Sequence, residues 1–365
     1  MIKRFTLFML LAGSLYMQGQ SRWLFETGVG GGYSLAHHVE MNHLTHRFIP
    51  SFQFSIEKTT FHLSSAWAKA YHYPEWGFGL TYQDFSDDRL GKVVALTFNT
   101  KLRLNSYQRK TGIYFMFNGG IGWVTRPYHP VENFKNNILG THLNNAYIFG
   151  PVIRFPIHHQ WKLNAGVVMY HYSNGSFKKP NLGINIPALY VAIRQSSSKL
   201  RDSLLEKFRI AFQKKRFLSL YAKGGWAEKN LELGGGFVGT LGMQINWHPV
   251  YKHIFSAGME WMDDRSMKRF VKYRAMAFQH YGGFKVPDYH RAGIYVGHAY
   301  YIDRFQILTD FGYYIYDKTE VFIPMYYRIG VRYALAPKWL VSFDLKLHLV
   351  EAEYLSIGIH RKFNF

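Results

Sequence analysis

Apolar and polar residues alternate along much of this chain, and few folds are compatible with that alternation. Every odd position in residues 339–349 is apolar, whereas the even positions from Ser342 to His348 are polar. Residues 94–104 and 355–365 follow a similar pattern. Successive side chains of a strand point to opposite faces, so a period of two with one apolar face predicts β-strands. Each segment has about the 10 residues that a tilted strand needs to cross a bilayer.

The first twenty residues have the layout of a secretory signal peptide. Lys3 and Arg4 precede an apolar run from Phe5 to Met17, and small and polar residues follow. We therefore expect residues 1–20 to be a signal peptide. Beyond them no run of about 18 apolar residues occurs, so the mature chain is expected to lack a transmembrane helix. An exported chain of this kind is either a soluble protein or a membrane barrel.

Strand patterns continue along the whole chain and predict an all-β fold. With the three segments above, they indicate an antiparallel transmembrane β-barrel of roughly 12–16 strands, with about 14 as the best single estimate. Residues 61–67 are a possible additional strand. The further segments are Trp23–Leu35, Phe48–Glu57, Gly77–Phe85, Thr111–Trp123, Ala146–Ile157, Trp161–Ser173, Ile184–Ile193, Phe217–Trp226, Leu233–Trp247, His253–Met262, Ala292–Tyr301, Phe305–Tyr316 and Met325–Ala334.

Aromatic residues gather near the ends of these segments, as in YHYPEWGF at residues 71–78, and the chain ends on Phe365. Both features are typical of bacterial outer-membrane barrels, whose aromatic girdles lie at the membrane interfaces. A soluble β-sandwich would alternate as well. The signal peptide, the long series of strands and their aromatic ends favour the barrel.

No Pro/Ser-rich or low-complexity linker divides the chain, so we expect a single barrel domain over residues 21–365. The segment SSSKLRDSLLEKF, residues 196–208, has helical spacing and predicts a short periplasmic turn or helix. Residues 131–145 and 263–290 are expected to be long polar loops, and the second contains the basic run KRFVKYR.

The chain is strongly basic, since Lys and Arg outnumber Asp and Glu 44 to 23 for a formal net charge of +21. In a cytosolic protein this excess would indicate a nucleic-acid partner, but export removes the chain from nucleic acid. Outside the inner membrane the main anionic partner is the phosphorylated glycolipid of the outer leaflet. A basic surface that is merely solvated has the same composition, so charge alone leaves both interpretations open.

Several chemistries are disfavoured by composition and spacing. The chain has no cysteine, which excludes disulfides, thiol catalysis and Cys-based zinc sites. His37, His38, His43 and His46 cluster without a helical His-x-x-x-His pair, so no metal site is expected. The runs GVGGGY and LGGGFVG lack the Gly-Lys-Ser/Thr of a phosphate loop, and no cofactor is expected.

The segment HYSNGSFKKPNLGIN, residues 171–185, places the residue types of a hydrolase between two predicted strands. The odd positions of the preceding strand are the more apolar, and continued alternation puts His171 and Ser173 on that face. Asn185 is in phase with the apolar positions of the returning strand. All three side chains are therefore predicted to face lipid at the ends of their strands. An enzyme whose substrate is itself a lipid needs polar groups there, where their cost is lower than at the bilayer centre.

His171 and Ser173 are close enough on one strand face for the imidazole to accept the hydroxyl proton, which would make Ser173 a nucleophile. The pair alone is weak, because His62 and Ser64 repeat it. The longer pattern closely resembles the signature of the PagL-type lipid A deacylases, also called acyloxyacyl hydrolases. That signature runs His-x-Ser-Asn, a Gly-containing loop with Lys, then Pro-Asn-x-Gly-Ile. Members are outer-membrane barrels that remove an ester-linked acyl chain from lipid A at a site on the barrel's outer surface.

The resemblance implies a role for each matching residue. His171 corresponds to the general base and Ser173 to the nucleophile. Asn181 corresponds to a residue that helps form the oxyanion hole, together with backbone N–H groups of the Gly175–Ser176 turn. Asn174 corresponds to an Asn of the motif that supports the site. The resemblance covers residues 171–185 and the barrel class, and the remaining strands have no counterpart in the short family members.

Lys178 and Lys179 lie at the tip of the same loop. They are expected to contact the phosphates of lipid A, since anionic headgroups lie at the level of the tip. An ordinary hydrophilic loop is the alternative.

Asn185 departs from the family pattern, which has a Glu at the third position of the triad. An Asn can accept the imidazole N–H and hold its tautomer, but it brings no negative charge. The corresponding Asp to Asn change in a serine protease costs about 10⁴ in turnover. Three interpretations follow: a site adapted to Asn, a carboxylate supplied from elsewhere such as Glu132, or an inactive enzyme. The intact remainder of the motif favours the first.

Together these observations predict a serine esterase of the bacterial outer membrane that hydrolyses an ester-linked acyl chain of lipid A. Its expected partners are lipid A or lipopolysaccharide and the bilayer. One alternative is a non-enzymatic channel or transporter for hydrophobic molecules, whose polar strand faces would line an open lumen. Another is an inactive barrel that binds lipopolysaccharide. The acyl position that is cut and a possible homodimer are left open.

Overall fold

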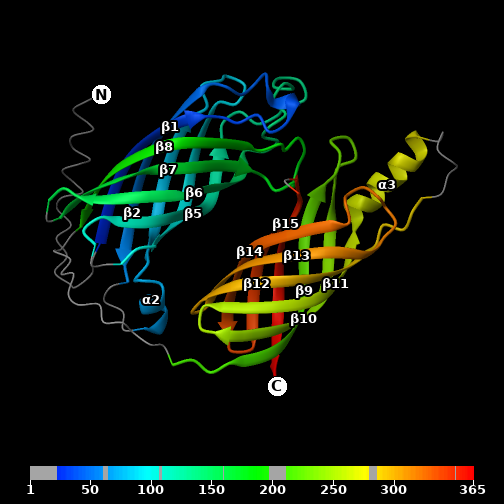
Figure 1. The fold of residues 1–365 in the computed structure, drawn as a ribbon. Helices are drawn as coiled ribbons and strands as arrows, with labels where there is room; N and C mark the ends of the chain where they lie inside the picture. Colours follow the sequence, from blue (N-terminus) through cyan, green and yellow to red (C-terminus); the bar gives the residue numbers. More distant parts are fainter. Residues whose placement is uncertain are drawn as a thin grey trace.

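The chain forms two β-barrels (Figure 1). The structure is a computed structural model that describes residues 23–60, 65–106, 109–158, 160–196, 211–278, 286–349 and 351–365. Within these residues sixteen strands pair antiparallel with their neighbours along the chain. Strand β1 pairs with β8 to close the N-terminal barrel, and β16 pairs with β9 to close the C-terminal barrel. The predicted antiparallel all-β barrel class is confirmed.

The strands of the N-terminal barrel are β1 (Trp23–Tyr33), β2 (Phe48–Thr59), β3 (Glu75–Asp84), β4 (Lys92–Arg103), β5 (Gly112–Val124), β6 (Leu143–Pro156), β7 (Trp161–Ser173) and β8 (Ile184–Ser196). Those of the C-terminal barrel are β9 (Lys215–Glu228), β10 (Gly235–Val250), β11 (His253–Asp264), β12 (Arg291–Ile302), β13 (Phe305–Asp317), β14 (Met325–Ala336), β15 (Trp339–His348) and β16 (Glu351–Asn364). The described helices are η1 (Val39–Met41), α2 (Ala66–Ala70) and α3 (Arg265–Ala277).

The expectation of one barrel over residues 21–365 is wrong. The predicted range of strand numbers includes the sixteen observed, but the best estimate was two strands short. Alternation tells which face a residue occupies, whereas it does not tell which strand closes the ring. Pairing of β8 with β1 or with β9 would bury the same face, and the observed register from Leu24–Ser196 to Gly32–Ala188 closes the first ring at eight strands.

Helix α3 lies in the segment 263–290, where the sequence predicts a polar loop. Asp264 caps the helix, because its side chain accepts a hydrogen bond of 2.9 Å from the Met267 backbone N–H. Met267 and Val271 are buried beneath it. None of the described helices is long and apolar enough to cross a membrane.

Other predictions fall partly or wholly outside the described residues. The signal peptide, residues 1–20, and residues 197–208 of the predicted turn or helix lie outside them. Of the possible strand at 61–67, residues 61–64 lie outside as well, and Trp67 belongs to α2.

Charged side chains fill the N-terminal barrel near the start of β1. Arg194 contacts Glu26 at 3.0 Å, Glu57 at 2.8 Å and Glu75 at 2.7 Å. Lys101 contacts Glu26 and Glu57, and Arg154 binds Glu75 through both of its terminal nitrogens. Three carboxylates thus face three cations. An eight-stranded barrel is just wide enough to be filled by such side chains.

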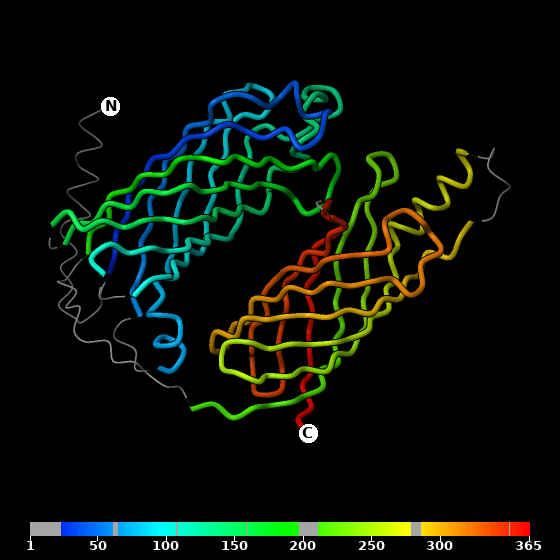
Figure 2. Tube along the Cα trace, viewed as in Figure 1, coloured from blue at the N-terminus to red at the C-terminus, as the bar shows by residue number. Residues whose placement is uncertain are grey.

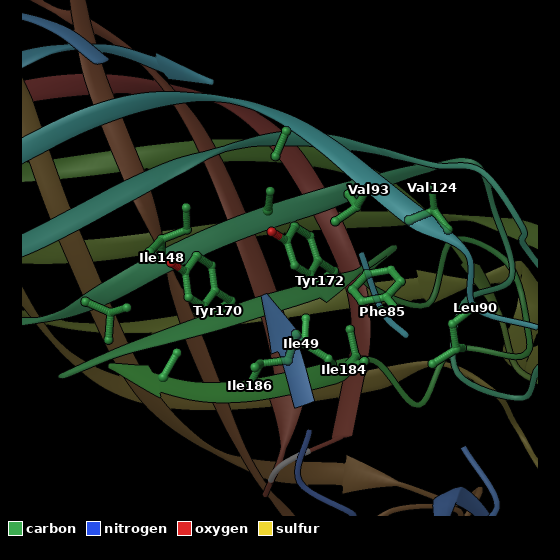
Figure 3. Packing of buried hydrophobic residues seen from close by; sticks show 14 of the residues in the cluster. Ile49, Phe85, Leu90, Val93, Val124, Ile148, Tyr170, Tyr172, Ile184 and Ile186 are labelled. Atoms are coloured by element: carbon green, nitrogen blue, oxygen red, sulfur yellow. The ribbon is translucent and has the colours of Figure 1, made fainter. Parts of the chain in front are cut away.

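The opposite end of the N-terminal barrel, where β7 ends and β8 begins, contains an apolar core (Figure 3). Tyr170 and Tyr172 of β7 and Ile184 and Ile186 of β8 point into it and are fully buried. Since neighbouring residues of a strand point to opposite faces, the positions between them face outward. The core therefore determines which residues of segment 171–185 reach the outer wall.

Among the described residues, hydrogen bonds join the two barrels in two regions. The loop between β7 and β8 meets the start of β16, where the Ser176 hydroxyl donates to the Ala352 carbonyl at 2.6 Å (Figure 2). Near the other end, the Tyr71 hydroxyl after α2 donates to the Tyr301 carbonyl of β12 at 2.8 Å. The first contact involves the loop that follows Ser173.

We expect Arg194→Met to destabilise the N-terminal barrel by about 3–5 kcal/mol, because three buried carboxylates lose a common partner. Urea unfolding in detergent micelles, followed by tryptophan fluorescence, measures the change. The matched control is Arg47→Met, since Arg47 is 54% exposed in its pair with Asp87 and such pairs contribute about 0–1 kcal/mol. Equal effects of the two substitutions would contradict a structural role for the interior network.

Candidate active site

Three polar side chains meet on the outer wall of the N-terminal barrel. The odd positions of β7 up to His171 are exposed or half-buried, as the alternation predicts, whereas Ser173 at the end of the strand is only 6% exposed. On this wall Val167 of β7 lies opposite Leu189 of β8, and the two are 54% and 70% exposed. His171 lies directly opposite Asn185, nearer the loop, and Ser173 ends the strand. The polar group therefore lies at the end of an apolar, lipid-facing strip.

These side chains form one hydrogen-bonded chain. The Ser173 hydroxyl lies 2.8 Å from Nε2 of His171, and Nδ1 of His171 lies 2.6 Å from Oδ1 of Asn185. Because Oδ1 can only accept, Nδ1 carries the proton and Nε2 presents a lone pair to the hydroxyl. This is the tautomer that a general base for serine requires.

Glu132 does not take part in this contact. Its side chain is exposed in the β5–β6 loop, where its backbone N–H donates to His129 at 3.1 Å. Asn185 occupies the position next to the imidazole, so of Asn185 and Glu132 the structure brings Asn185 to His171.

Neighbouring residues hold the pair in place. The ring of Tyr147 on β6 stacks beside His171, with ring centroids 6.2 Å apart. The Asn145 side chain donates to the Ser173 carbonyl at 3.0 Å. Gly183 has a φ of +73°, and a Cβ there would lie 3.2 Å from the Cβ of Ser173. Gly183 thus lets the returning chain pass close to the pair, a constraint visible beforehand only as the Gly of the motif.

The loop after Ser173 is organised by its two asparagines. The Asn181 Oδ1 accepts from the Asn174 backbone N–H at 2.8 Å, and the Asn174 side-chain amide donates to the Lys178 carbonyl at 2.7 Å. Gly175 and Ser176 form a turn with φ values of +63° and +62°. The Asn181 amide is thus held next to the residue that follows Ser173.

The two lysines at the tip differ in their surroundings. Lys178 is exposed. Lys179 is half-buried, and its ammonium group lies 3.5 Å from the Glu351 carboxylate of the C-terminal barrel. Of the pair, Lys178 is the one whose side chain extends into solvent.

His37, which the sequence showed only as one of four clustered histidines, lies next to Asn185. Its Nδ1 is 3.4 Å from Nδ2 of Asn185, and its Nε2 is 3.0 Å from the Leu182 carbonyl. His43 instead contacts the Lys135 carbonyl at 2.8 Å. In the described part of the chain no group of three or more His, Asp or Glu side chains is arranged to hold a metal ion.

The segment that carries His37 is tied to its surroundings on both sides. The Leu35 backbone N–H donates to the Asn185 carbonyl at 2.8 Å. Further along, Arg89 donates to the His43 carbonyl and to the Asp87 carboxylate, and its hydrogen bond lowers the pKa of Asp87. No local sequence signal links His37 to Asn185, because 148 residues separate them.

Comparison with protein families finds two matches. The model described as lipid A 3-O-deacylase (PagL) matches residues 57–194, and the model described as acyloxyacyl hydrolase, C-terminal domain, matches residues 216–365. The first match ends within β8 and the second begins within β9, so the two models divide the chain as the two barrels do. No curated protein matches the chain.

Comparison with solved structures returns outer-membrane proteins. A crystal structure of the outer-membrane enzyme PagL is 14% identical, with a TM-score of 0.32, and the match covers 46% of this chain and 97% of that chain. A triple mutant of Rhodopseudomonas blastica porin is 10% identical, with a TM-score of 0.18 and coverage of 93% and 99%. The Acinetobacter baumannii outer membrane protein Omp33 is 7% identical, with a TM-score of 0.17 and coverage of 95% and 100%.

Proposed function

The chain belongs to the lipid A 3-O-deacylase (PagL) family of the bacterial outer membrane, and on this premise we propose that it hydrolyses the ester-linked acyl chain at position 3 of lipid A. The observation that carries the proposal is the hydrogen-bonded series Ser173–His171–Asn185 on the outer wall of the N-terminal barrel. A serine made nucleophilic by a neighbouring imidazole is the arrangement of a serine esterase.

In the first half of the reaction, Oγ of Ser173 attacks the carbonyl carbon of the acyl ester. Its proton passes to Nε2 of His171, which lies 2.8 Å away. The Oδ1 dipole of Asn185 faces the imidazolium that forms. The carbon–oxygen bond to the sugar then breaks, and His171 gives the proton to the sugar oxygen that leaves.

The oxyanion that forms during the attack needs hydrogen-bond donors. We assign this role to Nδ2 of Asn181 and to backbone N–H groups of the Gly175–Ser176 turn. The contact of Asn181 Oδ1 with the N–H of Asn174, the residue that follows Ser173, supports this role, because it holds the amide next to the nucleophile. Removing one such donor typically lowers turnover by about 10²–10³.

In the second half, water attacks the acyl group on Ser173. His171 accepts a proton from the water and returns it to Oγ as the acyl–oxygen bond breaks. The products are a free fatty acid and a lipid A that has one hydroxyl in place of the ester. Both can remain in the outer leaflet, because the site lies on the lipid-facing wall.

The apolar strip next to the site fits a lipid substrate. Val167 and Leu189 lie opposite each other on the outer wall and are largely exposed. An acyl chain whose ester carbon is at Ser173 would lie along this strip and replace one layer of membrane lipid. The polar ends of the substrate would then lie at the loop, where the surrounding medium is aqueous.

The channel alternative is disfavoured by the interiors of the two barrels. Arg194, Glu26 and Glu57 fill the first, and Arg328 contacts Glu260 at 2.7 Å and Asp344 at 3.0 Å in the second. All of these side chains are buried. Eight strands enclose a space that side chains fill, whereas an aqueous lumen needs a wider ring.

We expect Ser173→Ala to abolish deacylation, with a loss of at least about 10³-fold in kcat, because the nucleophile is removed. Mass spectrometry of lipid A from cells that express each version measures the product that lacks one acyl chain. Equal insertion in the outer membrane is the control. Lipid A that is unchanged by the wild-type protein, or equally deacylated by both, would contradict the proposal.

We also propose that Lys178 contacts a phosphate of lipid A. We expect Lys178→Gln to raise KM by about fivefold with kcat unchanged, because a lysine near an anionic surface contributes about 1 kcal/mol. The matched control is Lys338→Gln, an exposed lysine at the opposite end of the C-terminal barrel. An unchanged KM, or equal changes in both variants, would remove Lys178 from the binding site.

A further inference from the structure

The Asn185 side chain has two chemically different ends, and only one of them suits catalysis. With Oδ1 toward His171, the imidazole keeps its proton on Nδ1 and Nε2 can accept from Ser173. With the amide reversed, Nδ2 would donate to Nδ1, and the remaining proton would move to Nε2. Ser173 would then have no acceptor. A carboxylate has no such problem, because both of its oxygens accept.

We propose that His37 is a positioning residue that holds the Asn185 amide with Oδ1 toward His171. The proposal rests on the proposed esterase function. Nδ1 of His37 lies 3.4 Å from Nδ2 of Asn185, whereas Oδ1 of the same amide contacts His171. This contact fixes the orientation of the Asn185 amide. A Glu at this position would need no such contact, because both of its oxygens accept.

The direction of each hydrogen bond follows from a backbone carbonyl. Nε2 of His37 lies 3.0 Å from the Leu182 carbonyl, which can only accept, so Nε2 carries the proton of the neutral ring. Nδ1 then presents a lone pair toward Asn185. Only Nδ2 can donate to that lone pair, and Oδ1 is left to face His171. Each hydrogen bond in the series from the Leu182 carbonyl to the Ser173 hydroxyl therefore pairs one donor with one acceptor.

Backbone contacts hold His37 in reach of the amide. The Leu35 N–H donates to the carbonyl of Asn185 itself at 2.8 Å, which joins the segment before His37 to β8. The carbonyl of Leu182 accepts from the other ring nitrogen of His37, and Leu182 lies three residues before Asn185 in the chain. His37 is therefore held near Asn185 by a contact of its own ring and by a backbone hydrogen bond two residues before it.

The test compares His37→Phe with His37→Gln. Phenylalanine keeps a planar ring but can hydrogen-bond to neither Asn185 nor the Leu182 carbonyl. Glutamine can do both, because its oxygen can accept from Nδ2 of Asn185 and its NH2 group can donate to the Leu182 carbonyl. We expect His37→Phe to lower kcat by about 10–100-fold with KM unchanged. This loss is smaller than the loss caused by an imidazole held permanently in the wrong tautomer. His37→Gln should restore most of the loss. His38→Phe, in the same loop, is the matched control and should behave as wild type.

A double-mutant comparison separates positioning from a general structural effect. In an Asn185→Asp background the carboxylate accepts with either oxygen, so His37→Phe should change kcat by less than about twofold. A loss of the same size in both backgrounds would overturn the proposal. So would a His37→Phe variant with the kcat of wild type.

A second readout distinguishes this proposal from the choice of substrate. An alkyl fluorophosphonate labels an activated serine without any need for lipid A, and its rate of reaction with Ser173 reports the imidazole tautomer. We expect slower labelling in His37→Phe and near wild-type labelling in His37→Gln. If wild-type protein labels but does not deacylate lipid A, the proposed function fails and the positioning role stands. Equal labelling of all versions overturns the positioning role.

The C-terminal barrel contacts the loop that contains the assigned oxyanion donors (Figure 2). The Glu228 N–H donates to the Ser176 carbonyl at 2.9 Å, and the Glu228 carboxylate accepts from the Lys179 N–H. The Ser176 hydroxyl donates to the Ala352 carbonyl. Leu355 lies so close to Gly175 that a Cβ there would be 2.6 Å from it. These contacts lie on both sides of Phe177.

From these contacts we infer that the C-terminal barrel holds the β7–β8 loop in its active conformation, with Glu228 as a positioning residue. Ser176 has a φ of +62°. This conformation costs conformational energy in a residue with a side chain, and it persists where the surrounding structure enforces it. Both its hydroxyl and its carbonyl are bonded to the C-terminal barrel. The second barrel therefore helps set the conformation of the turn to which the oxyanion donors are assigned.

The test is Glu228→Leu, which keeps the backbone donor but removes the acceptor for Lys179. We expect kcat to fall by about 10-fold or more with KM little changed. Oxyanion donors act only in the transition state, so their misplacement slows turnover without weakening substrate binding. Glu228→Gln keeps an accepting oxygen and should retain activity. Glu351→Gln removes only the exposed pair with Lys179 and is the matched control.

Folding is checked by the heat-dependent mobility of each variant on gels and by its insertion in the outer membrane. A folded, inserted Glu228→Leu with the kcat of wild type would overturn the inference. So would a Glu228→Gln variant as impaired as Glu228→Leu. Fluorophosphonate labelling of Ser173 again gives a rate that does not depend on lipid A, so a wrong substrate assignment would not affect the outcome.

Discussion

Closure of the N-terminal barrel at eight strands is the constraint on which the site depends. The β1–β8 pairing makes a ring so narrow that side chains fill it, with ion pairs at one end and an apolar core at the other. The side chains of Tyr170 and Tyr172 point into that core and are fully buried. Strand geometry then places His171 and Ser173 on the outer wall, at the end of the lipid-facing strip. The inward packing of two tyrosines thus positions the proposed base and nucleophile.

An amide in place of a carboxylate changes what the site requires from its surroundings. A carboxylate accepts with both oxygens and stabilises an imidazolium by its charge. Asn185 supplies an acceptor at only one end, so its orientation becomes part of the chemistry. His37 and the Leu182 carbonyl form a hydrogen-bond path with the directions needed for that orientation. None of these contacts replaces the negative charge that a Glu would bring.

The second barrel gives the short β7–β8 loop a rigid neighbour. Among the described residues its interior holds buried ion pairs such as that between Arg328 and Glu260, as expected of an eight-stranded barrel filled by side chains. The contacts of Ser176 and Glu228 connect this barrel to the turn after Ser173. Two barrels of equal strand number therefore have different relations to the site: the N-terminal one carries the reacting groups, and the C-terminal one packs against their loop.

Local patterns in the sequence determined much of this description. Period-two alternation identified the strands and the outward faces of His171, Ser173 and Asn185, because side-chain direction in a strand depends only on neighbouring residues. The motif supplied the family. The division into two barrels, the helix α3, and the contacts of His37 and Glu228 came only from the tertiary structure. Each depends on which distant segments pair, since His37 is 148 residues from Asn185, and strand alternation is the same whichever partner closes the ring.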